Sequence, residues 1–118
     1  MKKPLQNERW QDTFQGAITI CDTEGIIQDM NKFAIQQFSK YGGEQLIGSN
    51  LLNCHPEPAR SKLKMMLEKQ LKNVYITQSG DEKKLIIQAP LYNDGHYSGF
   101  VELSINYSEV IPVLKRDG

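Results

Sequence analysis

The sequence has little cysteine and histidine and no excess of charge of either sign. Its 118 residues include two cysteines and two histidines, and 14 basic side chains balance 14 acidic ones. Cys21 and Cys54 form no Cys-x-x-Cys pair and no disulfide framework, so we expect two free thiols that are buried or half-buried. Because the net charge is zero, the chain offers a phosphate backbone no electrostatic attraction, and we expect no binding to nucleic acid.

Long hydrophobic runs are also missing. No apolar stretch approaches the length that spans a bilayer, and the basic start of the chain is not followed by the apolar stretch of a secretory signal. These features favour a cytoplasmic protein without membrane attachment. A chain of 118 residues, with 39% hydrophobic and 24% charged residues, is large enough for one domain around one core.

The side chains on which most enzymes rely are not grouped along the sequence. Nucleophilic catalysis needs a nucleophile, a base and an orienting acid, and metal chemistry needs clustered ligands. The only histidines are His55 and His96, and His96 lies in a predicted turn. Carboxylates such as Glu44, Glu57 and Asp81 fall on predicted surfaces. We therefore expect no enzymatic activity and no metal site built from side chains alone.

The first regular elements are a predicted hairpin and a capped helix. Residues 17–22 alternate with a period of two and contain β-branched side chains, which predicts a strand. The residues between Asp22 and Gly25 are typical of a tight turn, and residues 25–28 return as a second strand. Asn31 is a good N-cap for the helix that follows, because its side chain can accept from the free amides of the first turn.

The chain before this hairpin is predicted to be a helical extension, residues 1–16. Trp10 and Phe14 are four residues apart and can share one helical face. This aromatic pair is suited either to a dimer contact or to packing on the sheet of its own chain.

A long helix and three more strands complete the predicted domain, residues 17–112. Pro56 and Pro58 suit the first turn of the helix, whose apolar stripe also includes the polar Gln70. Residues 74–78, 84–89 and 99–107 read as antiparallel strands joined by hairpins. Pro112 ends the domain, and residues 113–118 are predicted to be a short polar tail.

The predicted order is two strands, several helices and three strands. Four short motifs lie on these elements: Asp22-x-x-Gly25, the capping Asn31, Gly43-Glu44-Gln45-Leu46-Ile47-Gly48, and His55-Pro56-Glu57 before the long helix. Together they resemble the PAS domain family over roughly residues 14–107. The resemblance implies an α+β fold with a five-stranded antiparallel sheet of order 2-1-5-4-3, and helices inserted between strands 2 and 3.

The resemblance also implies a function. PAS domains act as sensor or interaction modules in signal transduction, and they commonly form homodimers and relay a change through flanking segments. We therefore expect a homodimer that works with a signalling partner protein, or with a fused effector that lies outside this sequence. A ligand-free dimerisation scaffold with a filled core is an alternative.

Some PAS domains carry haem or flavin, and two residues of this sequence can be compared with the cofactor-binding residues of those domains. His55 is a candidate axial ligand of haem, since neutral imidazole binds iron, although His-Pro-Glu also occurs here in PAS domains without cofactors. Asn53-Cys54 matches only the first two residues of the motif that holds the reactive cysteine of flavin photosensors. We therefore expect no cofactor, with a haem or flavin redox or gas sensor as the alternative.

A small-molecule pocket between the helices and the sheet is the remaining candidate site. Polar groups on an inward face need a partner, so Gln37 and Gln70 are candidates for orienting a ligand. The strand residues Ile87, Val101 and Leu103 are expected to complete the apolar wall. The candidate pocket residues are Phe33, Gln37, Phe38, Leu52, His55, Met66 and Gln70.

Overall fold

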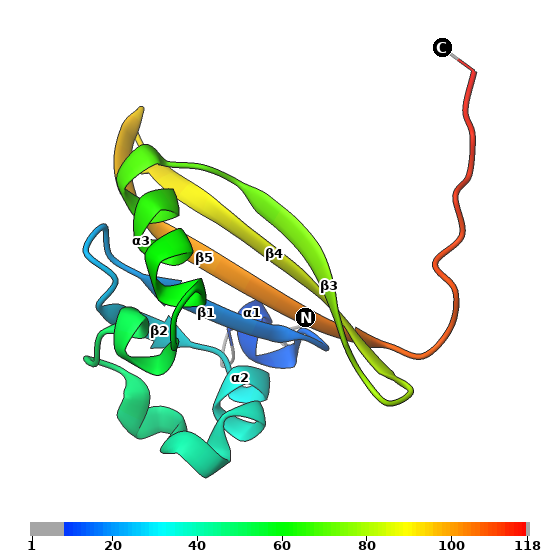
Figure 1. Cartoon of the computed structure of the whole chain (residues 1–118), viewed down its shortest axis with the longest axis horizontal. Coiled ribbons are helices and arrows are strands. Elements are labelled where there is room, and N and C mark those ends of the chain that lie inside the picture. Colours follow the sequence, from blue (N-terminus) through cyan, green and yellow to red (C-terminus); the bar gives the residue numbers. More distant parts are fainter. Residues whose placement is uncertain (1–8, 118) are drawn as a thin grey trace, which may run out of the picture.

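The computed structural model describes residues 9–117. Part of the predicted N-terminal extension, residues 1–8, and the last residue of the predicted tail lie outside the described residues. The elements follow the predicted order (Figure 1). They are α1 (Trp10–Thr13), β1 (Ala17–Cys21), β2 (Ile27–Met30), α2 (Lys32–Gln37), the 3-10 turns η1 (Ser39–Tyr41), η2 (Gly43–Leu46) and η3 (Leu51–Cys54), α3 (Ala59–Lys69), β3 (Asn73–Ser79), β4 (Glu82–Asn93) and β5 (His96–Tyr107).

The five strands form one sheet, and the predicted topology is confirmed. The order across the sheet is β2-β1-β5-β4-β3, and every neighbouring pair is antiparallel. The helical segments between β2 and β3 lie on one face of this sheet, with α3 crossing its strands (Figure 1). The hairpin of β4 and β5 is the longest, with 12 residues in each strand.

The turn after β1 and the cap of α2 form as their residue types predict. The Oδ1 atom of Asp22 accepts from the backbone amides of Glu24 and Ile26, both at 2.9 Å, and Gly25 has a φ of +95°. At such a positive φ glycine is strongly favoured over residues with a Cβ atom. Asn31 precedes α2, and its Oδ1 atom accepts from the amide of Ala34 at 2.9 Å.

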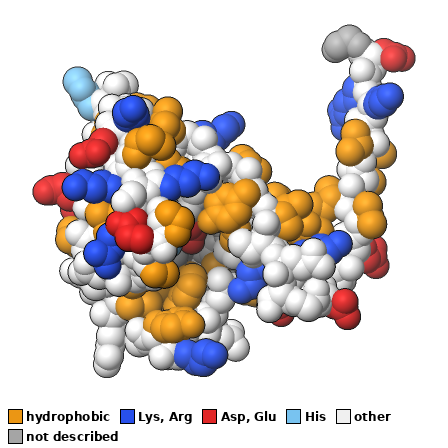
Figure 2. All heavy atoms as spheres, viewed as in Figure 1, with side chains coloured by type: hydrophobic (Ala, Val, Ile, Leu, Met, Phe, Trp, Pro, Cys, Tyr) orange, Lys and Arg blue, Asp and Glu red, His pale blue; other side chains and the backbone are white. Residues whose placement is uncertain are grey.

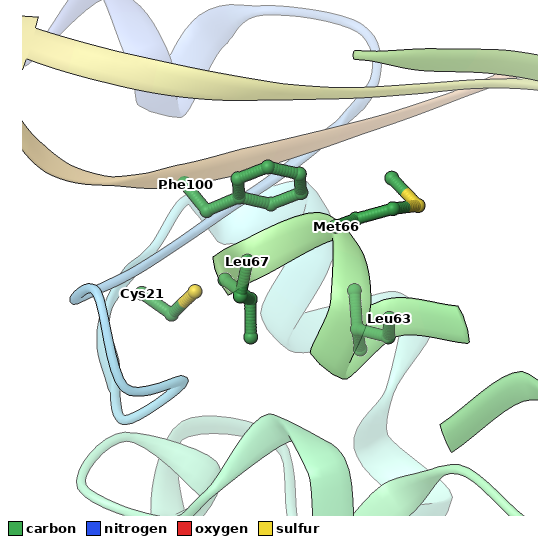
Figure 3. Close-up of a cluster of buried hydrophobic side chains, with 5 residues drawn as sticks. All are labelled: Cys21, Leu63, Met66, Leu67 and Phe100. Atoms are coloured by element: carbon green, nitrogen blue, oxygen red, sulfur yellow. The ribbon is translucent and has the colours of Figure 1, made fainter. Parts of the chain in front are cut away.

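The core joins α3 to the middle of the sheet. Leu63, Met66 and Leu67 of α3 form one buried cluster with Cys21 of β1 and Phe100 of β5 (Figure 3). The three α3 residues follow the spacing of one helical face, which explains why the helix docks with this side toward the sheet. A second cluster lies under α2, with Ala17, Ile27, Met30 and Ala34 at its centre.

The position of Phe100 defines the two faces of the sheet. Side chains alternate along a strand, so Phe100 and its in-register neighbours face the helices, and we call this the inner face. Val101 and Leu103 lie on the opposite, outer face, together with Ile87, which pairs with Leu103. The expectation that these three residues complete the pocket wall is therefore wrong.

The described chain ends are less regular than predicted. In the N-terminal part, α1 is a helix of four residues, and the Arg9 guanidinium bonds to the carboxylates of Asp12 and Asp29 at 3.2 and 2.6 Å. After β5, residues 108–117 form neither helix nor strand and extend away from the sheet (Figure 1). Val113 and Leu114 are 85% and 77% exposed, so the tail segment is not purely polar.

None of the described helices has the length and apolar character needed to span a membrane.

Candidate functional site

A cavity of about 540 Å³ lies between the inner face of the sheet and the segment that runs from β2 to η3. Its apolar lining consists of Ile27, Met30, Phe38, Tyr41, Leu46 and Leu51. The remaining lining residues, which carry a polar group or a thiol, are Thr19, Asn53, Cys54, His55 and Glu102. Figure 2 shows hydrophobic side chains exposed on this side of the molecule, below α3. A mostly apolar cavity with a few convergent polar groups is the usual form of a small-molecule site.

A second cavity of about 220 Å³ lies on the other side of His55, under α3. It is lined by Ala59, Lys62, Leu63 and Met66 from α3, by Asn73 and Tyr75 from β3, and by Gln88 from β4. His55 lines both cavities and is the one residue that their linings share.

A row of polar side chains crosses the floor of these cavities. Thr19, Glu102, Gln88 and Asn73 are in register on β1, β5, β4 and β3, so all four are on the inner face. The amide of Gln88 donates to the carboxylate of Glu102 at 2.8 Å and accepts from the amide of Asn73 at 3.4 Å. The row therefore joins the two cavities by a chain of hydrogen bonds.

His55 is held by its own segment. Its Nδ1 atom is 2.9 Å from the carbonyl oxygen of Leu51. Since that carbonyl can only accept, Nδ1 carries a proton, and in a neutral ring Nε2 is then the acceptor. Asn50 caps η3 by accepting from the amide of Leu52 at 2.8 Å, and Arg60 donates to the carbonyl of His55 at 3.2 Å.

The Glu57 residue of the His-Pro-Glu motif has a structural role. Its carboxylate accepts hydrogen bonds from the amide and the hydroxyl of Ser61 at 3.0 and 2.8 Å. The first of these gives a partner to a backbone amide in the first turn of α3. These two hydrogen bonds lower the pKa of Glu57. The motif thus fixes the start of α3, and His55 is its one residue that lines the cavities.

The structure brings together part of the predicted pocket. Phe38 and His55 line the main cavity, and Met66 lines the smaller one with His55. Phe33 and Leu52 pack against the two core clusters instead of lining either cavity. Their apolar character is thus used for core packing.

The two glutamines have different positions from those expected. Gln70 is not in the apolar stripe of α3, because the helix ends at Lys69 and Gln70 takes a left-handed conformation with φ of 57°. Its exposed side chain accepts from the hydroxyl of Tyr92 at 2.9 Å. Gln37 lies at the end of α2, and its buried Oε1 atom has no hydrogen-bond partner among the described residues. It lines neither cavity.

The two thiols differ in environment. Cys21 is buried, and burial raises the pKa of its thiol to about 11, with further contributions from Asp22 and Glu102. Cys54 lines the main cavity but is exposed, so the expectation of two buried or half-buried thiols is wrong for this residue. Within residues 9–117, no group of three histidine, cysteine or acidic side chains is placed to hold a metal ion.

The polar floor was missed by sequence reasoning, although β5 carries a signal for it. Along this strand Phe100, Glu102 and Ser104 alternate with Val101, Leu103 and Ile105. From the sequence alone, the aliphatic set of Val101, Leu103 and Ile105 would be expected to face the core, and the mixed set of Phe100, Glu102 and Ser104 to face away from it. Only the contact of Phe100 with α3 shows that the mixed set faces the helices.

Comparisons with known proteins find likeness in structure but not in sequence. No protein-family model matches the chain, and no curated protein matches it. Among solved structures, a sensory box sensor histidine kinase from Vibrio cholerae has a TM-score of 0.65 and 15% identity, covering 90% of this chain and 92% of that one. The PAS domain of histidine kinase ThkA has a TM-score of 0.61 and 21% identity, covering 78% and 99%.

A third similar structure is described as a haem protein. The Aer2 receptor from Vibrio cholerae, described as a dual PAS-heme oxygen sensor, has a TM-score of 0.63 and 16% identity, with 77% of this chain and 93% of that chain covered. With these neighbours and the sheet order β2-β1-β5-β4-β3, the chain has the PAS fold. The fold implied by the resemblance is confirmed.

Proposed function

We propose that this chain is a non-catalytic sensor domain of cytoplasmic signal transduction that binds a small molecule between its helices and its sheet. The observation that carries the proposal is the cavity of about 540 Å³, which has apolar walls and includes Thr19 and Glu102 of the polar row in its lining. Polar groups that are held in place by hydrogen bonds to one another can orient a ligand, while the apolar walls supply burial.

The signal is relayed through a homodimer. The outer face carries a continuous set of aliphatic side chains: Ile20, Val74, Ile76, Leu85, Ile87, Ala89, Val101, Leu103 and Ile105. Val74 and Ile76 are 52% and 54% exposed. An apolar sheet face of this kind is suited to a second copy of the chain. Ligand occupancy changes how the helices pack on the inner face, and the sheet transmits the change to the dimer and to a signalling partner.

The ligand proposal is tested by thermal unfolding against a panel of metabolites. A compound that binds only the native state raises the melting temperature. Leu46→Trp is designed to fill the main cavity and abolish this response, whereas Ile47→Trp places the same ring next to it at a residue outside the lining. If no compound raises the melting temperature, or if the Leu46→Trp protein responds as the wild type does, the domain is a scaffold.

A haem sensor is the second candidate function. It is favoured by His55, which lines the main cavity. Its Nδ1 atom bonds to a carbonyl, as in many metal-binding histidines, and in a neutral ring the Nε2 atom can then bind iron. Protein that is reconstituted with haem and then separated from unbound haem would show a Soret band, which His55→Ala removes. A spectrum without this band, or one unchanged in His55→Ala, excludes this function. A visible spectrum of the protein as purified, before haem is added, reports bound flavin.

A further inference from the structure

Glu102 is the unusual residue of the main cavity. It is the only Asp, Glu, Lys or Arg among the described side chains that line the cavity, and it projects from the centre of the inner face. Thr19 on one side and Gln88 on the other are its in-register neighbours. Since lysine and arginine are missing from this lining, the carboxylate determines the sign of the charge that a ligand meets.

The hydrogen bonds of Glu102 leave much of its capacity unused. A carboxylate can accept about four hydrogen bonds, and among the described residues Glu102 accepts one from a side chain, the 2.8 Å bond from Gln88. Glu102 forms no ion pair with another residue in the range 9–117. Gln88 is itself fixed by Asn73, so the carboxylate is oriented without being neutralised.

The charge of Glu102 extends through the inner face. Burial is the main cause of the raised pKa of Tyr75, and Glu102 adds to it. For Cys21 burial comes first, Asp22 second and Glu102 third. A negative charge in a partly dehydrated site is stabilised by a cation or by further hydrogen-bond donors. Among the described residues the cavity lining holds no lysine or arginine, so a ligand can supply the positive charge that Glu102 lacks there.

We infer that the main cavity binds an organic cation: a small molecule with a protonated amine or amidine group on an apolar body. This inference rests on the proposed ligand-binding function and names its chemical class. The ammonium group lies at Glu102 and Thr19, and the apolar body lies against Met30, Leu46 and Leu51. Phe38 and Tyr41 add aromatic rings to the same lining, and such rings attract cations.

The same geometry discriminates against anions. A ligand carboxylate or phosphate inside the cavity would face Glu102 without any lysine or arginine in the described lining to offset the repulsion. A neutral ligand of the same shape would fill the apolar part and leave the carboxylate without a charged partner. The expected order of affinity is therefore cation, neutral molecule, anion.

Three probes of the same shape test this order: phenethylamine, 2-phenylethanol and phenylacetate. Isothermal titration of the whole chain is expected to show phenethylamine binding at least about tenfold more tightly than the other two. Glu102→Gln is expected to remove this advantage. It keeps an oxygen that can accept from Gln88, so folding is retained, which circular dichroism checks. Glu82→Gln makes the same change at the exposed start of β4 and is expected to bind as the wild type does.

Several outcomes would overturn the inference. One is that 2-phenylethanol or phenylacetate binds as tightly as phenethylamine. The others are a preference for phenethylamine that persists in Glu102→Gln, and no binding of any probe by folded wild-type protein. Failure of the underlying ligand proposal is recognised separately. If the ligand proposal itself fails, no metabolite raises the melting temperature of the wild type. If a neutral or anionic metabolite raises it and has no effect on the Leu46→Trp protein, the cavity is a ligand site and only the preference for a cation is wrong.

Discussion

At the residue scale, the side chain of Asn31 connects several elements of the fold by hydrogen bonds. It is 2% exposed, and its Oδ1 atom accepts from the amides of Ala34 and Ile18, both at 2.9 Å. Its Nδ2 atom donates to the carbonyls of Gln11 and Gly16 at 2.7 and 2.9 Å. The residue therefore caps α2 and also joins this helix to β1 and to α1. Its cap role follows from residue type, but the other three bonds depend on the fold.

Replacing Asn31 by alanine is expected to lower the free energy of unfolding by about 2–4 kcal/mol. The change removes the cap and leaves buried backbone groups without partners. Urea denaturation measures the loss. Asn31→Asp keeps the acceptor and removes the donor, so an intermediate loss is expected. Asn106→Ala, at an exposed position of β5, is the control. A loss below about 0.5 kcal/mol in Asn31→Ala would contradict this role.

At the scale of elements, β1 and β5 lie close together beside Gly99. A Cβ atom on this residue would lie 2.5 Å from the carbonyl oxygen of Cys21, and both residues are buried. The contact is with backbone, which cannot rotate away as a side chain can. Gly99 is therefore required by the packing of two neighbouring strands, whereas Gly25 is required by the φ of its own turn.

Gly99→Ala is expected to destabilise the domain by about 1–3 kcal/mol, because the start of β5 must move away from β1. Since this region carries Phe100 of the core, the variant is also expected to exchange the amides of β1 faster in hydrogen-exchange measurements. The neighbouring Ser98→Ala, at an exposed residue, serves as control with a loss below about 0.5 kcal/mol. Equal stability of the two variants would show that the strands adapt.

For the whole molecule, the distribution of apolar surface is the main feature. The inner face is covered by helices and carries the polar row, while the outer face is aliphatic across four strands. Residues 110–114 add further exposed apolar side chains beyond the sheet, as Figure 2 shows for the extended segment. Such a surface is more extensive than scattered exposed residues and favours association.

Leu103→Lys is expected to weaken the proposed homodimer by at least about tenfold, because it places a charge at the centre of the outer face. Sedimentation equilibrium measures the dissociation constant. Thr77→Lys introduces the same charge at an exposed position on the inner side of β3 and is expected to leave the dimer unchanged. A monomeric wild type, or a Leu103→Lys protein that dimerises equally well, would rule out this interface.

The sequence by itself determined the local elements and their order. The turn at Asp22 and Gly25, the cap at Asn31 and the hairpins of the last three strands depend on interactions among residues close in the chain, so residue type and spacing predict them. The resemblance to PAS domains added the strand order, which periodicity cannot supply. The fold was therefore predictable to a large extent.

Only the tertiary structure decided the site. A period of two tells that a strand has two faces but not which one turns inward, and the contact of Phe100 with α3 settles this for β5. It places Glu102 and Gln88 in the floor of the cavities and moves Ile87, Val101 and Leu103 to the outer face. Likewise, the end of α3 at Lys69 turns Gln70 toward Tyr92. These positions depend on contacts between distant segments, which local patterns do not encode.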